Sequence, residues 1–200
     1  MKVINVPISG RIYTCNTYLV LGPWKRIEDV NAMVDVGADP ALLASLDDIA
    51  TGVGKRKVEL VVLTHAHSDH YANLPLIKSA WNPTVCAWSR FLPGVDHVLE
   101  DGEKLHMGDT IFEVMHTPGH SEDSICLYNE VEGALFVGDT PVIIRAPGGT
   151  YEPAFVEALE RLCNRDVRVI YPGHGDPITQ DARGQMLRSL ALVKGQQVSA

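Results

Sequence analysis

The sequence predicts an α+β fold, and two kinds of pattern carry this prediction. Short apolar runs such as 58–63 and 134–138, bounded by polar or glycine residues, are typical of buried strands. Segments starting at Asp39-Pro40 and at Pro153 place apolar residues at helical spacing directly after a proline. The 200 residues show no repeat or linker, so we expect a single domain over residues 1–200.

The elements alternate irregularly along the chain. The expected strands lie at 2–8, 11–21, 32–34, 58–63, 83–87, 104–107, 110–116, 124–129, 134–138 and 167–171. The expected helices run from 39 to about 51, over 71–80, from 153 onwards, and over about 180–194. A turn at Ser9-Gly10 should join the first two strands, and residues 88–103 should be irregular.

Composition excludes several classes of protein. The formal net charge of -8 argues against a nucleic-acid binder, which needs a basic face to neutralise phosphates. No apolar run approaches the ~20 residues that span a bilayer, and the first residues are too interrupted for a signal peptide. The cysteines are scattered and form no C-x-x-C pair, which indicates reduced thiols. We therefore expect a cytoplasmic protein with neither a nucleic-acid nor a membrane partner.

One short segment concentrates metal-binding chemistry. The sequence His65-Ala66-His67-Ser68-Asp69-His70 follows the apolar run 60–63, with Thr64 between them. Imidazole and carboxylate side chains are costly to gather in so short a stretch unless a cation lies among them. They are the ligands that suit zinc, iron or manganese. The segment is therefore predicted to form the first half of a metal site, and no cysteine adjoins it in the sequence.

The same arrangement recurs at other strand ends. His120, Asp139 and His174 each follow a predicted strand, among small residues that permit tight turns. Taken singly, such histidines are usually hydrogen-bonded or exposed, and such aspartates are usually turn residues. Together with the first segment they supply seven donors, which exceeds one tetrahedral zinc and suits two metals. The remaining histidines, His97, His106 and His116, lack this turn context and are expected to be structural or superficial.

These residues resemble the metallo-β-lactamase-fold superfamily over nearly the whole chain. The resemblance rests on motifs that occur in the family's order: Asn16-Thr17-Tyr18-Leu19-Val20, Met33-Val34-Asp35-Val36-Gly37, Thr64 to His70, Thr117-Pro118-Gly119-His120, Val137-Gly138-Asp139 and Tyr171-Pro172-Gly173-His174-Gly175. It implies a four-layer αβ/βα sandwich, in which two mixed β-sheets are flanked by helices and the site lies at one edge between the sheets.

The resemblance also implies how the donors are divided. The residues that match one metal's ligands are His65, His67 and His120, and those that match the other's are Asp69, His70 and His174. Asp139 matches the residue that bridges the two metals. Asp35 matches a residue that supports a metal-binding loop without ligating the metal. The alternative is that Asp35 is an ordinary turn aspartate.

Within the superfamily, the sequence motifs around His120 and Asp139 most closely resemble those of the glyoxalase II group of thioesterases. One β-lactamase subclass carries arginine at the position of His70, and another keeps the Asp-His pair. A bridging residue like Asp139 is characteristic of glyoxalase II, lactonases and phosphodiesterases. Two features depart from glyoxalase II: about 26 residues follow His174, too few for its C-terminal helical domain, and Tyr71-Ala72-Asn73 replaces a Gly-Gly segment. We expect a glyoxalase II-like hydrolase without that domain.

The expected activity is that of a dinuclear-metal-dependent hydrolase. A metal-bridging hydroxide would attack a thioester or related ester carbonyl, with Asp69 as the catalytic residue that orients it. A thiolate leaving group, with a thiol pKa of about 8.5, needs no strong general acid. The sequence shows no obvious acid for an alkoxide, which favours thioesters. The two divalent metal ions are expected to be zinc, with iron or manganese as alternatives.

Other activities of the same fold stay open. A persulfide dioxygenase-like oxidoreductase would hold one iron through residues matching His65, His120 and Asp139. A lactonase, a phosphodiesterase or a non-catalytic metal protein are further alternatives. The expected partner is a small-molecule substrate, with Tyr71 and Arg145 as candidates for the pocket wall. The alternatives for these two residues are a first-turn helix aromatic and a solvated arginine.

Overall fold

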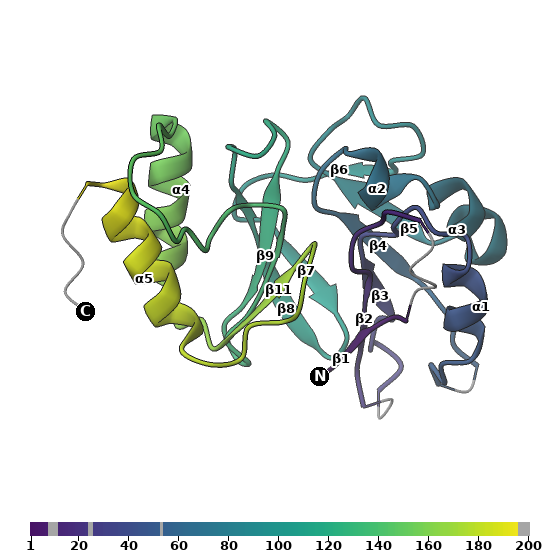
Figure 1. Cartoon of the computed structure of the whole chain (residues 1–200). Coiled ribbons are helices and arrows are strands. Elements are labelled where there is room, and N and C mark those ends of the chain that lie inside the picture. Colours follow the sequence, from purple (N-terminus) through teal and green to yellow (C-terminus); the bar gives the residue numbers. More distant parts are fainter. Residues whose placement is uncertain (8–11, 24–25, 53, 196–200) are drawn as a thin grey trace.

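Two β-sheets lie face to face in the computed structural model, which describes residues 1–7, 12–23, 26–52 and 54–195 (Figure 1). The first sheet has the order β1-β2-β3-β4-β5-β6, with strands Lys2–Asn5, Tyr18–Leu21, Ala32–Val34, Leu60–Leu63, Thr84–Ala87 and His97–Val98. The second has the order β11-β10-β9-β8-β7, where β7 to β11 span Lys104–Met107, Thr110–His116, Ile125–Asn129, Ala134–Gly138 and Val169–Pro172.

Both sheets are mixed, as predicted. In the first, β1, β2 and β3 pair antiparallel, whereas β3, β4, β5 and β6 pair in parallel. In the second, β10 and β11 are parallel and the other pairs are antiparallel. Parallel neighbours end at the same edge of a sheet. The carboxyl ends of β3 and β4 therefore lie together, and so do those of β10 and β11.

Helices cover the outer face of each sheet, which completes the predicted four layers. The first sheet carries α1, α2 and α3, which span Leu42–Asp47, Ser68–Tyr71 and Leu74–Trp81 (Figure 1). The second carries α4, Pro153–Cys163, and α5, Ala182–Val193, which pack against it and each other.

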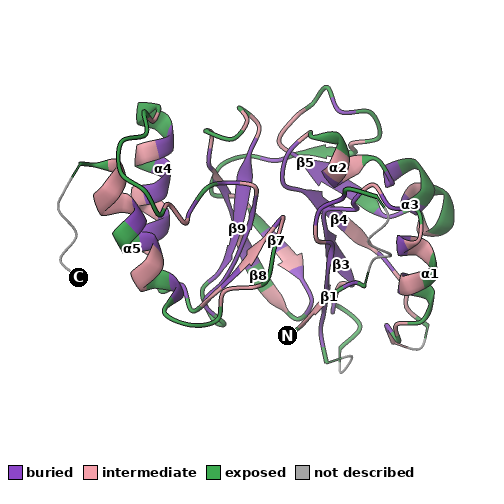
Figure 2. Cartoon of the chain, viewed as in Figure 1, coloured by how far each residue is buried: buried purple, intermediate pink, exposed green. Residues whose placement is uncertain are grey.

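Side-chain alternation along the strands builds three apolar cores. In β2, Leu19 and Leu21 face the first set of helices, whereas Tyr18 and Val20 face the other sheet. The third core lies between the second sheet and α4 with α5. Because both faces of the central strands are covered, β2, β3, β9 and β10 are buried throughout, and Figure 2 shows this for β3 and β9. This explains why they appear as continuous apolar runs rather than alternating ones.

The N-terminal strands are shorter than predicted. Within the described part of the predicted strand 11–21, strand pairing begins at Tyr18, and β1 ends at Asn5. In residues 14–17, which lie outside the sheet, the amides of Cys15 and Asn16 bond to distant segments: Cys15 donates to the carbonyl of Asp69 at 3.1 Å and Asn16 to that of Gly173 at 2.6 Å. The alternating side chains of residues 14–17 therefore belong to a packed loop and not to a strand. The predicted turn at Ser9-Gly10 lies outside the described residues.

The helices after β3 and β4 also differ from the prediction. The first was expected over 39–51 but spans Leu42–Asp47, because Pro40 and Ala41 form a turn in which the side chain of Asp39 accepts from the amide of Ala41. The helix expected over 71–80 is divided into α2 and α3. Residues 88–103, expected to be irregular, include the two-residue strand β6. Among the described residues, no helix has the length and apolarity needed to cross a membrane.

Candidate metal centre

The loops at the carboxyl ends of the strands bring all seven predicted donors together. Within each of two groups, the possible ligand atoms lie within 4.8 Å of one another. We call the first group, His65, His67 and His120, the trio. We call the second group, Asp69, His70, Asp139 and His174, the quartet. The donors of each group come from both sheets, so only the packed sandwich assembles them.

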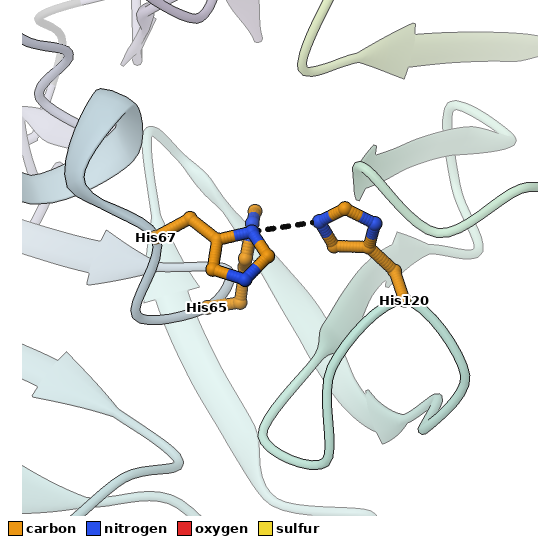
Figure 3. A group of neighbouring side chains, drawn as sticks. All are labelled: His65, His67 and His120. Atoms are coloured by element: carbon orange, nitrogen blue, oxygen red, sulfur yellow. Dashed lines mark hydrogen bonds between the residues drawn. The ribbon is translucent and has the colours of Figure 1, made fainter.

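The trio combines one buried and two exposed imidazoles. His65 and His67 lie in the loop between β4 and α2, and His120 lies in the loop between β8 and β9. Figure 3 shows the three rings converging, with His67 Nδ1 2.9 Å from His120 Nε2. Burial, aided by the neighbouring charge of His70, lowers the pKa of His65 to about 4. The neutral imidazole that results is the form that binds a metal.

The quartet is centred on His70, which is fully buried. Its Nδ1 donates a hydrogen bond of 2.8 Å to Oδ2 of Asp35. The backbone N–H and the hydroxyl of Thr64 also donate to Asp35, each at 2.8 Å. The bond between His70 and Asp35 orients the imidazole ring so that its Nε2 faces the other quartet members. This is the arrangement expected of a supported metal ligand. Asp35 sits at a φ of 57°, a left-handed conformation that the three hydrogen bonds hold in place.

Electrostatics at the quartet favour positive charge. Burial acts to lower the pKa of His70, but the carboxylates of Asp35 and Asp139 outweigh it, and the pKa is raised. Burial acts in the opposite direction on Asp139, yet the adjacent histidines, His70 foremost, hold its pKa at about 2. The carboxylate is therefore ionised near neutral pH, and the site as a whole attracts a cation.

Asp139 lies between the two groups. Its Oδ2 is 3.6 Å from His120 Nε2 in the trio and 3.5 Å from His174 Nε2 in the quartet. Its Oδ1 is 3.3 Å from His70 Nε2. The single carboxylate thus faces donors from both groups. In addition, Asp69 Oδ2 lies 3.1 Å from His174 Nε2, which links α2 to the loop after β11.

Two glycines permit this close approach. A Cβ on Gly173 would collide with Asp139 Oδ1 and lie 2.8 Å from His70 Cε1. A Cβ on Gly138, which has a φ of 50°, would collide with the hydroxyl of Thr64 and lie 2.7 Å from its Cβ. The loops that carry Asp139 and His174 can therefore pack on the first sheet's histidine loop only because both positions lack a side chain.

The donor set fits divalent cations. Nε2 of His65 and Nε2 of His70 are buried and make no hydrogen bond within the described part of the chain, although His70 Nε2 lies 3.3 Å from Asp139 Oδ1. Buried polar atoms are rarely left unpartnered, and a metal ion satisfies an imidazole nitrogen in such a position. Imidazole with carboxylate is also a ligand set that zinc, iron and manganese accept.

Sequence reasoning missed an N-terminal segment that holds the centre together. The amide of Cys15 donates to the carbonyl of Asp69 at 3.1 Å, and the Cys15 thiol groups with Asp35 and His70. The side chain of Asn16 donates to the carbonyls of Pro172 and Gly175 at 3.0 and 2.7 Å. Although no cysteine adjoins the histidine segment in sequence, Cys15 therefore packs against it. The Asn16 motif had signalled the fold, but its spacing carried no sign of these bonds.

Tyr13 is a second residue that the sequence did not single out. Its ring stacks on His174 with a centroid separation of 5.1 Å, and its hydroxyl lies 3.4 Å from His174 Nε2. The side chain is 76% exposed, so it borders the centre without being part of the core. It belongs to the irregular segment that was predicted to be a strand.

The two predicted substrate-contact residues, Arg145 and Tyr71, lie in different surroundings. Arg145 lines a cavity that also includes His120, Asp139 and His174. Tyr71 does not line this cavity, because its ring packs against the core between the first sheet and its helices. The remaining histidines lie outside both groups: His97 pairs with Glu103 at 2.7 Å, His116 stacks on Trp88 at 3.9 Å, and His106 belongs to β7.

Comparison with known families agrees with this geometry. The family described as the Metallo-beta-lactamase superfamily matches residues 10–89 and 87–174 of the chain. The chain belongs to this superfamily. Its fold is also shared with solved members: the metallo-beta-lactamase family protein TTHA1429 from Thermus thermophilus has a TM-score of 0.68 at 22% identity, over 97% of this chain and 79% of that one. The BLEG-1 B3 metallo-beta-lactamase gives the same TM-score and identity, over 97% and 100%.

Curated relatives in the metallo-beta-lactamase superfamily carry enzyme names. An atrochrysone carboxyl ACP thioesterase from Emericella nidulans is 31% identical over 167 residues, which cover 82% of this chain and 52% of that protein. A hydroxyacylglutathione hydrolase from Francisella tularensis subsp. novicida is 38% identical over 100 residues, or 47% and 39% of the two chains. The chain thus spans about half the length, or less, of the curated relatives it matches.

Proposed function

We propose that this chain is a dinuclear-metal-dependent hydrolase that cleaves a thioester or related ester bond, and that residues 1–200 act as one domain. The observation that carries the proposal is the position of Asp139, whose carboxylate faces His120 of the trio and both His70 and His174 of the quartet. A carboxylate placed between two groups of ligands is suited to holding two cations at once. Zinc is the preferred metal, with iron or manganese as alternatives.

Each residue has a distinct task in this proposal. The trio holds one cation and the quartet the other, with Asp139 shared between them, and Asp35 keeps His70 in its ligating orientation. When bound, such cations make hydroxide available near neutral pH and polarise the carbonyl under attack. The carboxylate of Asp69, fixed at 3.1 Å from His174, orients the attacking water and accepts its proton.

The choice of a thioester rests on the leaving group and on the relatives. A thiolate leaves without a strong acid because a thiol has a pKa of about 8.5. Proteins similar to this chain bear the names ACP thioesterase and hydroxyacylglutathione hydrolase. We propose a small-molecule substrate, contacted by Arg145, an exposed cavity residue, and by the Tyr13 hydroxyl beside His174. Tyr71 is left out of this role because it packs in a core.

The arrangement of the quartet favours two metals over a single iron. A mono-iron centre of the persulfide dioxygenase type would use His65, His120 and Asp139. In such a centre, the convergent donors Asp69, His70 and His174 would bind no metal. These features support the hydrolase proposal.

Metal analysis and substrate screening on one preparation test the proposal. We expect two equivalents of divalent metal per chain and hydrolysis of thioesters faster than of lactones or phosphodiesters. Asp139→Ala should lower kcat by about 10²–10³-fold, because it removes the carboxylate shared by both groups. The same variant should bind less than two equivalents of metal, measured by elemental analysis.

Asp166→Ala serves as the matched control, since Asp166 is exposed and lies outside both groups. This variant should keep its activity and its metal. Unchanged turnover in Asp139→Ala would contradict the bridging role. One iron per chain with oxygen consumption on a persulfide would replace the hydrolase proposal with the oxidoreductase alternative.

A further inference from the structure

A cavity of about 640 Å³ opens directly beside the metal centre. His120, Asp139 and His174 line one part of it, so it is continuous with the trio and the quartet. Most of the remaining wall is apolar, formed by Pro141, Val142, Ile143, Ile170 and Ile178. The volume lies in the range of pockets that hold small organic ligands, which are typically about 300–1,000 Å³.

The apolar wall is an extension of the third core. Val142 and Ile170 are buried members of the core between the second sheet and its helices, and Ile143 and Ile178 pack against it. Reciprocal backbone hydrogen bonds of 3.0 and 2.9 Å join Ile170 and Ile178, which folds the segment after His174 back along β11. The wall is therefore part of the packed sandwich, and its shape exists before any ligand binds.

The loop after Asp139 is anchored as well. The amide of Val142 donates to the carbonyl of Thr140 at 2.8 Å, and the amide of Ile144 donates to the hydroxyl of Ser189 in α5 at 2.8 Å. These bonds place Ile143 at the cavity wall between two fixed points. Arg145 and Asp176 are the charged side chains that complete the lining apart from Asp139, and both are exposed.

We propose that this cavity binds the acyl group of the substrate, and that the acyl group is a hydrocarbon chain rather than a small hydroxyacyl group. The inference rests on the proposed thioesterase function and specifies its substrate class. The scissile carbonyl must lie at Asp139, so one side of it faces the apolar wall. Hydrocarbon gains from burial there, whereas a hydroxyl or an amide would lose its bonds to water without replacement by aliphatic side chains.

A ladder of acyl chain lengths tests this inference on the metal-loaded protein. The substrates are N-acetylcysteamine thioesters of acetate, butyrate, hexanoate and lactate, which share one thiol. We expect kcat/KM to rise by about fourfold per added methylene, the gain that burial of one CH₂ produces. The lactoyl thioester should be slower than the butyryl thioester. A flat or falling ladder would overturn the inference.

Variants localise the effect to the cavity. Ile143→Asn should lower kcat/KM for the hexanoyl thioester more than for the acetyl thioester, which flattens the ladder. Ile111→Asn is the matched control, because Ile111 is 51% exposed in β8 and does not line the cavity. The control should retain the slope of the wild type. An unchanged slope in Ile143→Asn together with a changed slope in Ile111→Asn would place the acyl site elsewhere.

Binding of the product carboxylates separates this inference from the proposed function. Butyrate, hexanoate and octanoate are titrated into the zinc-loaded protein by calorimetry, a measurement independent of turnover. Affinity that rises with chain length, without any thioester hydrolysis, would uphold the acyl cavity and reject the thioesterase function. Thioester hydrolysis with equal kcat/KM along the ladder, and with carboxylate affinity that does not depend on chain length, would uphold the thioesterase function and reject the acyl cavity.

Discussion

The trio and the quartet differ in how the protein supports them. In the trio, His67 and His120 are exposed; their rings contact each other and the buried ring of His65, and His120 also faces Asp139. In the quartet, His70 is fully buried and bonded to Asp35, which is itself fixed by Thr64. One quartet member, His70, is thus attached to the cores of the sandwich through Asp35, whereas two of the three trio histidines lie at exposed loop positions.

The difference shows that similar candidate ligands can be held in two ways. The buried ring of His70 is supported by residues from elsewhere in the chain: Asp35, which follows β3, accepts from its Nδ1, and Cys15 of the N-terminal segment packs beside it. Exposed ligands can be satisfied by water and need fewer protein partners. Substitutions near the quartet should therefore affect folding and metal binding together, whereas those in the trio should affect metal binding alone.

Removal of Asp35 should have the largest effect on stability. Asp35→Ala leaves Nδ1 of His70 and the backbone N–H of Thr64 buried without an acceptor. We expect the free energy of unfolding to fall by about 3 kcal/mol, measured by chemical denaturation of the metal-free protein. Asp35→Asn keeps one acceptor oxygen and should lose less. Equal stability of Asp35→Ala and the wild type would show that the quartet does not depend on this support.

Removal of the Asn16 side chain should have an intermediate effect. Asn16→Ala abolishes hydrogen bonds to the carbonyls of Pro172 and Gly175 and to the Tyr18 hydroxyl. We expect about 1–2 kcal/mol of destabilisation and weaker binding of the metal at the quartet, because the loop that carries His174 loses its tether. Metal titration followed by calorimetry measures the second effect.

Asn5→Ala provides the control for Asn16, since the Asn5 side chain is exposed and its described hydrogen bond, of 3.3 Å, is to Asn16 itself. It should change neither stability nor metal affinity appreciably. If the two variants behave alike, the bonds from Asn16 to the β11 loop do not position His174.

Removal of an exposed trio ligand should have the smallest effect on folding. His67→Gln should change the free energy of unfolding of the metal-free protein by about 0.5 kcal/mol or less, as is usual for surface positions. It should nevertheless lower the metal content by one equivalent, measured by elemental analysis. Large destabilisation of this variant in the absence of metal would erase the contrast between the trio and the quartet.

Most of the fold was predictable because its signals are local. The apolar runs at β4, β9 and β10 and the proline that opens α4 appear where expected, since burial on both faces requires continuous apolar sequence. One error falls where backbone groups bond to distant segments. Residues 14–17 alternate like a strand, but the amides of Cys15 and Asn16 bond to the carbonyls of Asp69 and Gly173 instead.

The candidate site divides in the same way. By itself, the sequence determined which donors are available, because His65 to His70, His120, Asp139 and His174 stand at strand ends beside turn-forming residues. Only the tertiary structure decided which of them meet, that Cys15 and Asn16 pack behind them, that Tyr13 stacks on His174, and that Tyr71 turns into a core. The physical reason is that donor chemistry belongs to single residues, whereas proximity across more than 100 positions is set by how the two sheets pack.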